Sequence, residues 1–149
     1  MGKNYYKNII WGIVVILFFS LFAVVTYNYF MQNRFFDLKL GSDILSSKAK
    51  ESFTVEVEIK NKMYSDLDSD YGYFLSYHLR SADNKTVIMD NIRTKIEKIK
   101  PGNTKWIKMI VDTNIMSGEY IMEIDIVKEH EFWYKDKGNI PLETKLIIE

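Results

Sequence analysis

An uncharged apolar run near the N-terminus is the feature that most constrains this chain. No Asp, Glu, Lys or Arg occurs between Lys7 and Arg34, and most of that interval reads IIWGIVVILFFSLFAVVTYNYFM. A helix rises about 1.5 Å per residue, so about 20 such residues cross a hydrocarbon layer about 30 Å thick. The run therefore predicts a transmembrane helix over residues 9–31.

The aromatic residues of the run support a membrane-spanning helix over its rivals. Trp11 lies near one end and Tyr27 and Tyr29 near the other, where amphipathic rings prefer the membrane interface. A buried core helix would need a much larger protein around it. A cleaved signal peptide is the stronger alternative, but the run is long for one, and Leu21 and Ala23 fit the small-x-small cleavage pattern poorly.

Charges beside the run leave its orientation nearly balanced. Lys3 and Lys7 precede it, and Arg34 and Lys39 follow it closely. A short head with a folded domain behind it is the usual arrangement of an N-in signal anchor. We therefore expect residues 1–8 to be a cytoplasmic head, the lipid bilayer to be a partner, and the C-terminal domain to be extracellular at the cell membrane.

The charge balance and the cysteine count exclude several classes of function. The chain has 20 Lys and Arg against 20 Asp and Glu, and no basic block, so it lacks the electrostatic attraction that nucleic-acid binding needs. It has no cysteine, which excludes disulfides, thiol catalysis and cysteine metal sites. Its 149 residues suffice for one domain and an anchor.

The remainder of the chain reads as short strands separated by turn residues. Residues 53–60 alternate apolar and polar side chains, the pattern of a half-buried antiparallel strand. The other predicted strands are residues 36–40, 73–80, 86–90, 93–99, 105–112, 120–127, 131–134 and 142–148. Residues 41–52 are polar and predict a loop, so residues 32–52 form a membrane-proximal segment and residues 53–149 an all-β antiparallel sandwich.

One strand opening carries a more specific signal. Gly118 is followed two residues later by Tyr120, which resembles the tyrosine corner of immunoglobulin-like sandwiches, where the phenol bonds back to the backbone. If Tyr120 points inward, then Met122, Ile124 and Ile126 also face the core.

A series of short motifs in one order resembles a known family. The motifs are Leu75-Ser76-Tyr77-His78, Ile92-Arg93-Thr94, Pro101-Gly102, Gly118-Glu119-Tyr120, Ile124-Asp125-Ile126-Val127 with Glu129, and Trp133-Tyr134. The series is similar to the immunoglobulin-like β-sandwich appended to bacterial surface-polysaccharide machinery. Examples are the C-terminal domain of O-antigen ABC-transporter ATPases and domains fused to sugar or methyl transferases. Three positions depart from the pattern: His130 replaces a Gly, Met116-Ser117 replaces a Pro, and Leu79 replaces a Trp.

The resemblance implies a non-catalytic domain that recognises or helps handle a cell-surface polysaccharide. The runner-up is a structural accessory subunit that binds a protein partner at the membrane. An outward face rich in aromatics and paired acids would favour a glycan ligand, and a flat apolar patch around Trp106 would favour a protein.

The predicted strand phase places a polar group of residues on one outer face. With Leu75, Tyr77 and Leu79 inward, His78 and Arg80 point outward. On the neighbouring strand Glu123 and Asp125 also point outward. Such planar hydrogen-bonding groups beside an aromatic ring are typical of sugar sites. The alternative is a solvated face with weak cross-strand ion pairs.

Two tryptophans complete the candidate residues. The inward set of residues 105–112 is Ile107, Met109 and Val111, so Trp106 would face outward and lie at the edge of that polar face. Trp133 is expected to close one end of the core.

No motif supports a cofactor, a metal ion or catalysis. The acidic stretch at residues 66–70 imitates the start of a calcium loop, but Gly72 comes two places late and Tyr77 stands where the bidentate Glu belongs. The histidines, His78 and His130, have no Ser or acid beside them in a nucleophile pattern. We therefore expect an acidic surface loop and no enzyme.

Overall fold

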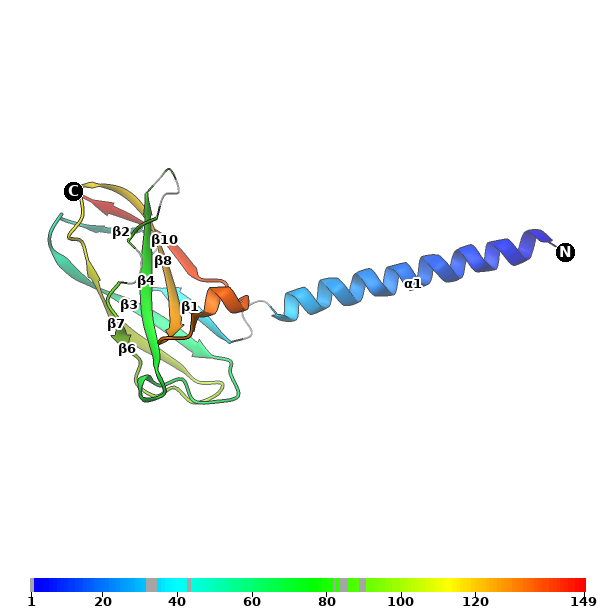
Figure 1. Cartoon of the computed structure of the whole chain (residues 1–149), viewed down its shortest axis with the longest axis horizontal. Coiled ribbons are helices and arrows are strands. Elements are labelled where there is room, and N and C mark those ends of the chain that lie inside the picture. The colour runs from blue at the N-terminus through cyan, green and yellow to red at the C-terminus, as the bar shows by residue number, and fades with distance from the viewer. Residues whose placement is uncertain (1, 32–34, 43, 82, 84–85, 89–90) are drawn as a thin grey trace. The chain divides into compact units, whose positions relative to one another are not determined.

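The chain forms two compact units, residues 1–32 and residues 33–149, which are described separately below. The computed structural model describes residues 2–31, 35–42, 44–81, 83, 86–88 and 91–149. Figure 1 shows an N-terminal helix and a domain of β-strands.

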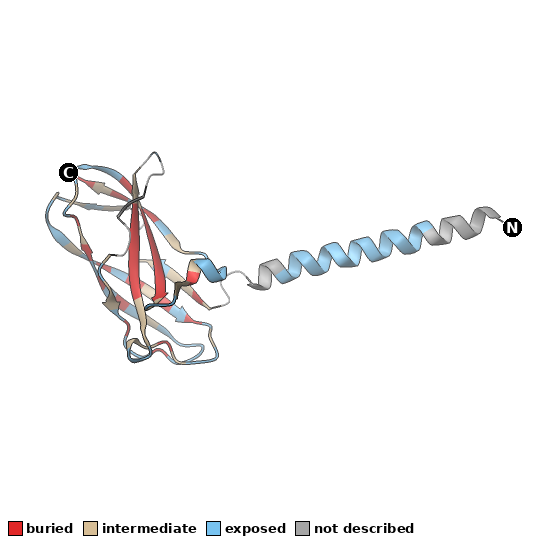
Figure 2. Cartoon of the chain, in the orientation of Figure 1, coloured by how far each residue is buried: buried red, intermediate tan, exposed pale blue. Residues whose placement is uncertain are grey.

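The first unit is helix α1 (Gly2–Met31). Side chains 10–27 are exposed along the whole of this stretch, as Figure 2 shows. The Ser and Thr hydroxyls in this stretch bond within the helix: Ser20 donates to the Leu17 carbonyl at 2.9 Å, and Thr26 donates to the Phe22 carbonyl at 2.8 Å. Residues 10–27 are apolar and long enough to cross a membrane, although a signal sequence near an N-terminus has the same features.

The second unit is mostly β-sheet, arranged as two sheets. The smaller sheet has the order β1-β3-β7 and consists of β1 (Phe36–Leu40), β3 (Ser52–Asn61) and β7 (Thr104–Asp112). The larger has the order β2-β10-β8-β4-β5, from β2 (Ile44–Ser47), β10 (Leu142–Ile148), β8 (Gly118–Lys128), β4 (Tyr73–Ser81) and β5 (Thr86–Ile88). Two short strands flank it: β6 (Thr94–Lys95) pairs with β4, and β9 (Phe132–Trp133) pairs with β8.

Most neighbouring strands run antiparallel. Strand β2 runs parallel to β10, and the other pairs are antiparallel. Two short 3₁₀ helices, η1 (Ser69–Tyr71) and η2 (Tyr134–Lys137), lie in the connections.

The core lies between the two sheets and follows the predicted strand phase. Leu75, Tyr77 and Leu79 of β4 are fully buried, and on β8 Met122 and Ile124 are also fully buried. Their partners across the interior come from alternate positions of the smaller sheet, such as Val57, Ile59, Met109 and Val111. The prediction of a sandwich-like β domain is confirmed.

The hydroxyls of two buried tyrosines bond to the backbone. The Tyr77 hydroxyl on β4 accepts a hydrogen bond from the Asp112 amide of the other sheet at 2.7 Å, and burial raises the pKa of this phenol to about 12. The Tyr120 hydroxyl donates to the Met116 carbonyl at 2.7 Å, which is the backbone bond that the corner motif predicts.

Two sequence predictions about strands are corrected. Residues 41–52 do not form a continuous loop, because β2 lies within them and pairs in parallel with β10. That parallel pairing comes from the last strand of the chain, so local sequence gives no signal for it. The segment 93–99 forms a strand only at Thr94–Lys95; beyond it Ile96 and Ile99 are buried at a three-residue spacing, and the Ile96 amide donates to the Ser69 hydroxyl at 2.6 Å. Residues 89 and 90, the end of another predicted strand, lie outside the described residues.

We expect Tyr120→Phe to lower the free energy of unfolding of residues 35–149 by about 1 kcal/mol, because it removes the bond to the Met116 carbonyl and leaves the ring in place. Urea unfolding measures the change, and Tyr64→Phe, at a fully exposed tyrosine, is the matched control. An unchanged midpoint for Tyr120→Phe would show that the corner bond adds nothing to stability.

Candidate functional site

The outer face of strands β4 and β8 carries most of the predicted site. The two strands pair with Ser76 opposite Asp125 and His78 opposite Glu123. Alternation sends these four side chains away from the core, because their neighbours Leu75, Tyr77, Met122 and Ile124 fill it. The structure therefore brings His78, Glu123 and Asp125 together, with Arg80 next along β4.

This face is not open to solvent, which corrects the expectation of an exposed polar surface. Exposed fractions are 5% for His78, 9% for Glu123 and 0% for Asp125. Figure 2 shows the central strands of the larger sheet as largely buried. Burial on the outer face means that another segment covers these residues.

The cover is residues 132–137, which form β9 and η2. The chain turns back after β8, so that Trp133 pairs with Val127. The Trp133 ring then lies against the His78 ring, with 4.0 Å between their centroids. Trp133 is half-buried on this outer face, so its predicted place at the end of the core is wrong.

Backbone and side-chain bonds fix the cover in place. The Lys135 amide donates to Asp125 Oδ2 at 2.8 Å, and Lys135 Nζ donates to Glu123 Oε1 at 2.6 Å. Arg80 extends the network, since it pairs with Glu143 and lies 3.9 Å from Glu123. The charged groups under the cover therefore have partners of opposite sign or backbone donors.

Arg93 closes the other side of the cover. Its guanidinium carbon lies 5.1 Å from the centroid of the Trp133 ring, and its Nε donates to Glu129 at 2.9 Å. A second guanidinium nitrogen donates to the Ser76 hydroxyl at 3.1 Å. Trp133 is thus held between a histidine ring and an arginine.

Asp125 is the residue with the most altered chemistry in this network. Burial raises the pKa of its carboxyl to about 7, against the opposing effect of the Lys135 amide and with a further increase from nearby Glu123. The shift is a direct consequence of the cover, because burial is its largest cause.

The turn before the cover has an unusual backbone conformation. His130 has φ 62°, in the left-handed region that favours glycine. The chain adopts this turn with a histidine instead of a glycine. His130 is exposed and does not belong to the buried polar network.

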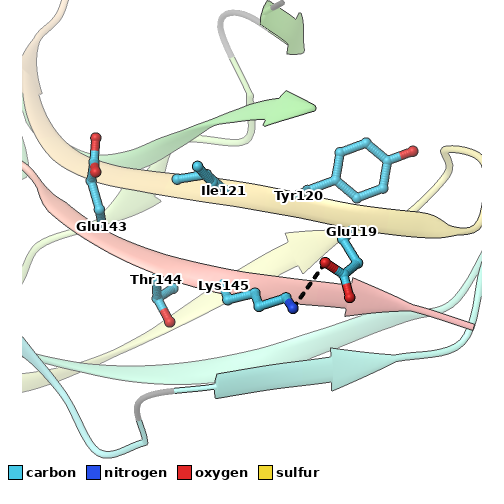
Figure 3. A pocket seen from close by; sticks show the side chains of 6 residues that line it. All are labelled: Glu119, Tyr120, Ile121, Glu143, Thr144 and Lys145. Carbon is cyan, nitrogen blue, oxygen red and sulfur yellow. Dashed lines mark ion pairs between the residues drawn. The ribbon is translucent and has the colours of Figure 1, made fainter. Parts of the chain in front are cut away.

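Strands β8 and β10 leave a shallow hollow beyond the cover. It has a volume of about 430 Å³ and is lined by Glu119, Tyr120, Ile121, Glu143, Thr144 and Lys145, as Figure 3 shows. Its charges are paired: Lys145 lies 2.9 Å from Glu119, and Glu143 contacts Arg80. Its aromatic residue, Tyr120, is buried, so the hollow presents no open ring.

Trp106 lies on the smaller sheet. This corrects its predicted place at the edge of the outer face of β4 and β8, which we call the His78 face. It lies near the start of β7. Its neighbour Ile107 points into the core, so Trp106 points outward, with 50% of its surface exposed. Its cross-strand partner is Glu58, and the next strand adds Lys39 3.9 Å from that carboxylate. The prediction that Trp106 faces outward is confirmed.

The surroundings of Trp106 are polar. Glu56 and Lys108 form the neighbouring cross-strand pair at 3.9 Å, and Ile110 is the other large apolar side chain exposed on this strand. We call the outward residues Lys39, Glu56, Glu58, Trp106, Lys108 and Ile110 the tryptophan face. Nothing in the sequence separates it from the His78 face, because that requires knowing which strands share a sheet.

The acidic stretch at residues 66–70 uses its carboxylates within the protein. Asp68 accepts from the Asp70 amide at 3.1 Å and caps η1, and Asp66 pairs with Lys98 at 2.6 Å. In the described part of the chain no group of three or more His, Cys, Asp or Glu is arranged to hold a metal ion.

Comparisons with known proteins concern the fold alone. No family model matches the chain, and no curated protein matches its sequence. A solved β-glucosidase from Listeria innocua matches 76% of this chain with 16% identity and a TM-score of 0.50, and the matched part is 16% of that enzyme's length. The CARDB domain of a Pyrococcus furiosus protein, in complex with two metal ions, matches at 11% identity, a TM-score of 0.46, and coverage of 77% of this chain and 86% of that one. The C-terminal domain of Wzt matches at 11% identity, a TM-score of 0.42, and coverage of 76% and 70%.

We expect Asp125→Asn to change how stability depends on pH. The raised pKa belongs to the folded state, so the folded protein holds a proton that the unfolded chain loses above about pH 4. The stabilisation that protonated Asp125 gives the folded state is therefore complete below about pH 4, and it is lost as the pH rises to about 7. The difference in free energy of unfolding between Asp125→Asn and the parent should therefore shift by about 2 kcal/mol in favour of the variant from pH 5 to pH 8.

Urea unfolding at the two pH values measures this difference. Asp136→Asn is the control, because it removes an exposed carboxyl from the same covering segment. A parallel pH dependence in the parent and in Asp125→Asn would mean that Asp125 is ionised in the folded protein at pH 5.

Proposed function

We propose that this chain is a membrane-anchored, non-catalytic immunoglobulin-like domain that binds a cell-surface polysaccharide through its tryptophan face. The observation that carries the ligand class is Trp106, a half-exposed indole set among charged side chains on a sheet face. The alternative is a structural accessory subunit that binds a protein partner at the membrane.

The topology supports an immunoglobulin-like sandwich. The first two strands lie in different sheets, and β2 runs parallel to the last strand while its neighbours are antiparallel. The larger sheet places β8 between β10 and β4, as the corresponding strands lie in such sandwiches. The Tyr120 bond to Met116 supports the same assignment.

The chemistry of α1 supports an anchor. Its residues 10–27 expose apolar side chains throughout, and the Ser20 and Thr26 hydroxyls are satisfied inside the helix. Lipid offers no hydrogen bonds, so a spanning helix must satisfy its polar groups internally. Trp11 and Tyr27 lie near the ends of this stretch, at the depth that such rings prefer.

The tryptophan face supports a glycan over a protein ligand. Sugars stack on aromatic rings and bond to planar polar groups beside them. Trp106 has Glu58 as its cross-strand neighbour, and charged Lys108 separates it from Ile110 along β7. A protein contact would favour a contiguous apolar patch, and here the exposed apolar side chains are set apart by charges.

The covered network supports a role without catalysis. His78, Glu123 and Asp125 are the acid-base groups that meet on one face, and Trp133 and Lys135 close over them. Ligand binding by His78, Arg80, Glu123 and Asp125 stays a prediction, and it would require residues 132–137 to move aside.

We expect the full chain to resist alkaline extraction from membranes, and a C-terminal tag to be digested when protease is added to intact cells. The reason is the uncharged apolar stretch within α1, with the β domain on its C-terminal side. A tag that stays protected until the cells are lysed would show that the C-terminal domain lies on the cytoplasmic side. A shortened, soluble mature chain would instead identify the helix as a cleaved signal.

We expect Trp106→Ala to weaken binding to purified cell-surface polysaccharide about tenfold, because it removes the stacking surface. Stability should change by only about 0.5 kcal/mol, because the side chain points outward. Tyr71→Ala, at another exposed aromatic residue, is the matched control. Binding by titration calorimetry and stability by urea unfolding separate the two effects.

Ile110→Ala distinguishes the two ligand classes. It should leave polysaccharide binding within about twofold, because an aliphatic side chain offers no flat ring to a sugar. If both Trp106→Ala and Ile110→Ala abolish capture of a solubilised membrane protein, and neither affects polysaccharide, the accessory-subunit function is correct.

A further inference from the structure

One end of the β domain is built around the point where the chain enters it. The Phe35 carbonyl accepts from the Lys62 amide at 2.8 Å, and the Phe36 amide donates to Asn139 Oδ1 at 3.4 Å. Residues 35–36, 62–65 and 137–140 therefore meet at this end, which we call the entry end.

Aromatic rings pack together at the entry end. Tyr134 lies at the centre of a cluster, with ring centroids 4.8 Å from Phe35, 4.9 Å from Phe36 and 5.2 Å from Phe132. The Tyr134 hydroxyl also lies 3.3 Å from the sulfur of Met63. The exposed residues of the entry end therefore lie over a packed aromatic cluster.

Asn61 fixes the loop that follows β3. Its side-chain amide donates to the Ser65 carbonyl at 2.9 Å and the Ile99 carbonyl at 2.8 Å, and its oxygen accepts from the Met63 amide at 2.9 Å. Asn61 itself is fully buried. The loop that these bonds hold presents Tyr64 to solvent with an exposed fraction of 105%.

Two further residues give the entry end its character. Ile140 is 51% exposed and directly follows Asn139, the partner of Phe36. Lys137 places its ammonium 4.7 Å from the centroid of the Phe132 ring and is also exposed. A phenol, an aliphatic side chain and an ammonium group are the chemistry that suits the interfacial layer of a bilayer.

Chain length limits how far this end can be from an anchoring helix. Three residues, 32–34, separate Met31 from Phe35, so the two Cα atoms are at most about 14 Å apart. The headgroup layer adds about 7 Å on each side of the hydrocarbon. If α1 spans a bilayer, the three-residue connection therefore allows Phe35 to reach the headgroup layer.

We propose that the entry end rests on the phospholipid headgroups, with Tyr64 and Ile140 in the interfacial layer and Lys137 beside lipid phosphates. The inference rests on the proposed anchor and adds a second, peripheral contact with the same membrane. It gives a function to a fully exposed tyrosine held in a fixed loop, and it leaves the tryptophan face free for another ligand.

The absence of cysteine from the chain allows a direct test with single labels. Tyr64→Cys and Ile140→Cys place a bimane fluorophore at the entry end. Met116→Cys is the matched control, because Met116 is 83% exposed and precedes the start of β8, whose other end at Lys128 pairs with Phe132 near the entry end. Eleven strand residues, about 35 Å, separate those two ends of β8.

The full chain is reconstituted into phosphatidylcholine–phosphatidylglycerol vesicles with nitroxide-labelled headgroups. We expect at least twofold quenching of labels at positions 64 and 140 and little quenching at position 116. Tyr64→Ser in the Ile140→Cys chain should reduce the quenching, because it removes an interfacial contact while the label stays in place.

Vesicle flotation separates the two ways in which the idea can fail. A chain that floats with the vesicles but shows no quenching at positions 64 and 140, or equal quenching at position 116, overturns the headgroup contact and leaves the anchor intact. Undiminished quenching with Tyr64→Ser overturns the contribution of Tyr64. A chain that does not float has no anchor, and the headgroup contact falls with it.

Discussion

The hydrogen bond from the Lys135 amide to the Asp125 carboxyl holds the covering segment on the outer face of the larger sheet, and the closure of that face depends on it. Strand alternation forces Ser76, His78 and Asp125 onto the outer face once their neighbours fill the core. A row of polar groups can be buried there only if donors and opposite charges come with the cover. Residues 132–137 supply both, and Asp125 carries the consequence in its raised pKa.

With that face closed, the domain exposes aromatic side chains on two other surfaces. The tryptophan face on the smaller sheet exposes an indole among paired charges, and the entry end exposes a tyrosine beside the point where the chain arrives. These surfaces use different strands and loops. A domain held near a membrane at one end can therefore keep its sheet face available for a ligand.

The sequence predicted the fold well where local alternation decides it. The bounds of β1 and β10 agree with the predicted strands, and the inward phase of Tyr77 and Tyr120 is confirmed. What it could not predict depends on contacts between distant residues. The parallel pairing of β2 with β10 joins residues about 100 positions apart, and the placement of Trp133 on His78 depends on a turn at His130 that folds the chain back. A run of Phe, Trp and Tyr straight after a polar turn was the available signal for that cover.

Direct titration of Asp125 tests most simply whether the polar face is closed. Carboxyl ¹³C resonances of the domain, assigned by NMR, report the midpoint of this one residue. The closed face predicts a pKa of about 7, because burial beneath residues 132–137 disfavours the carboxylate. A midpoint near 4 would contradict it, because burial would then not disfavour the Asp125 carboxylate.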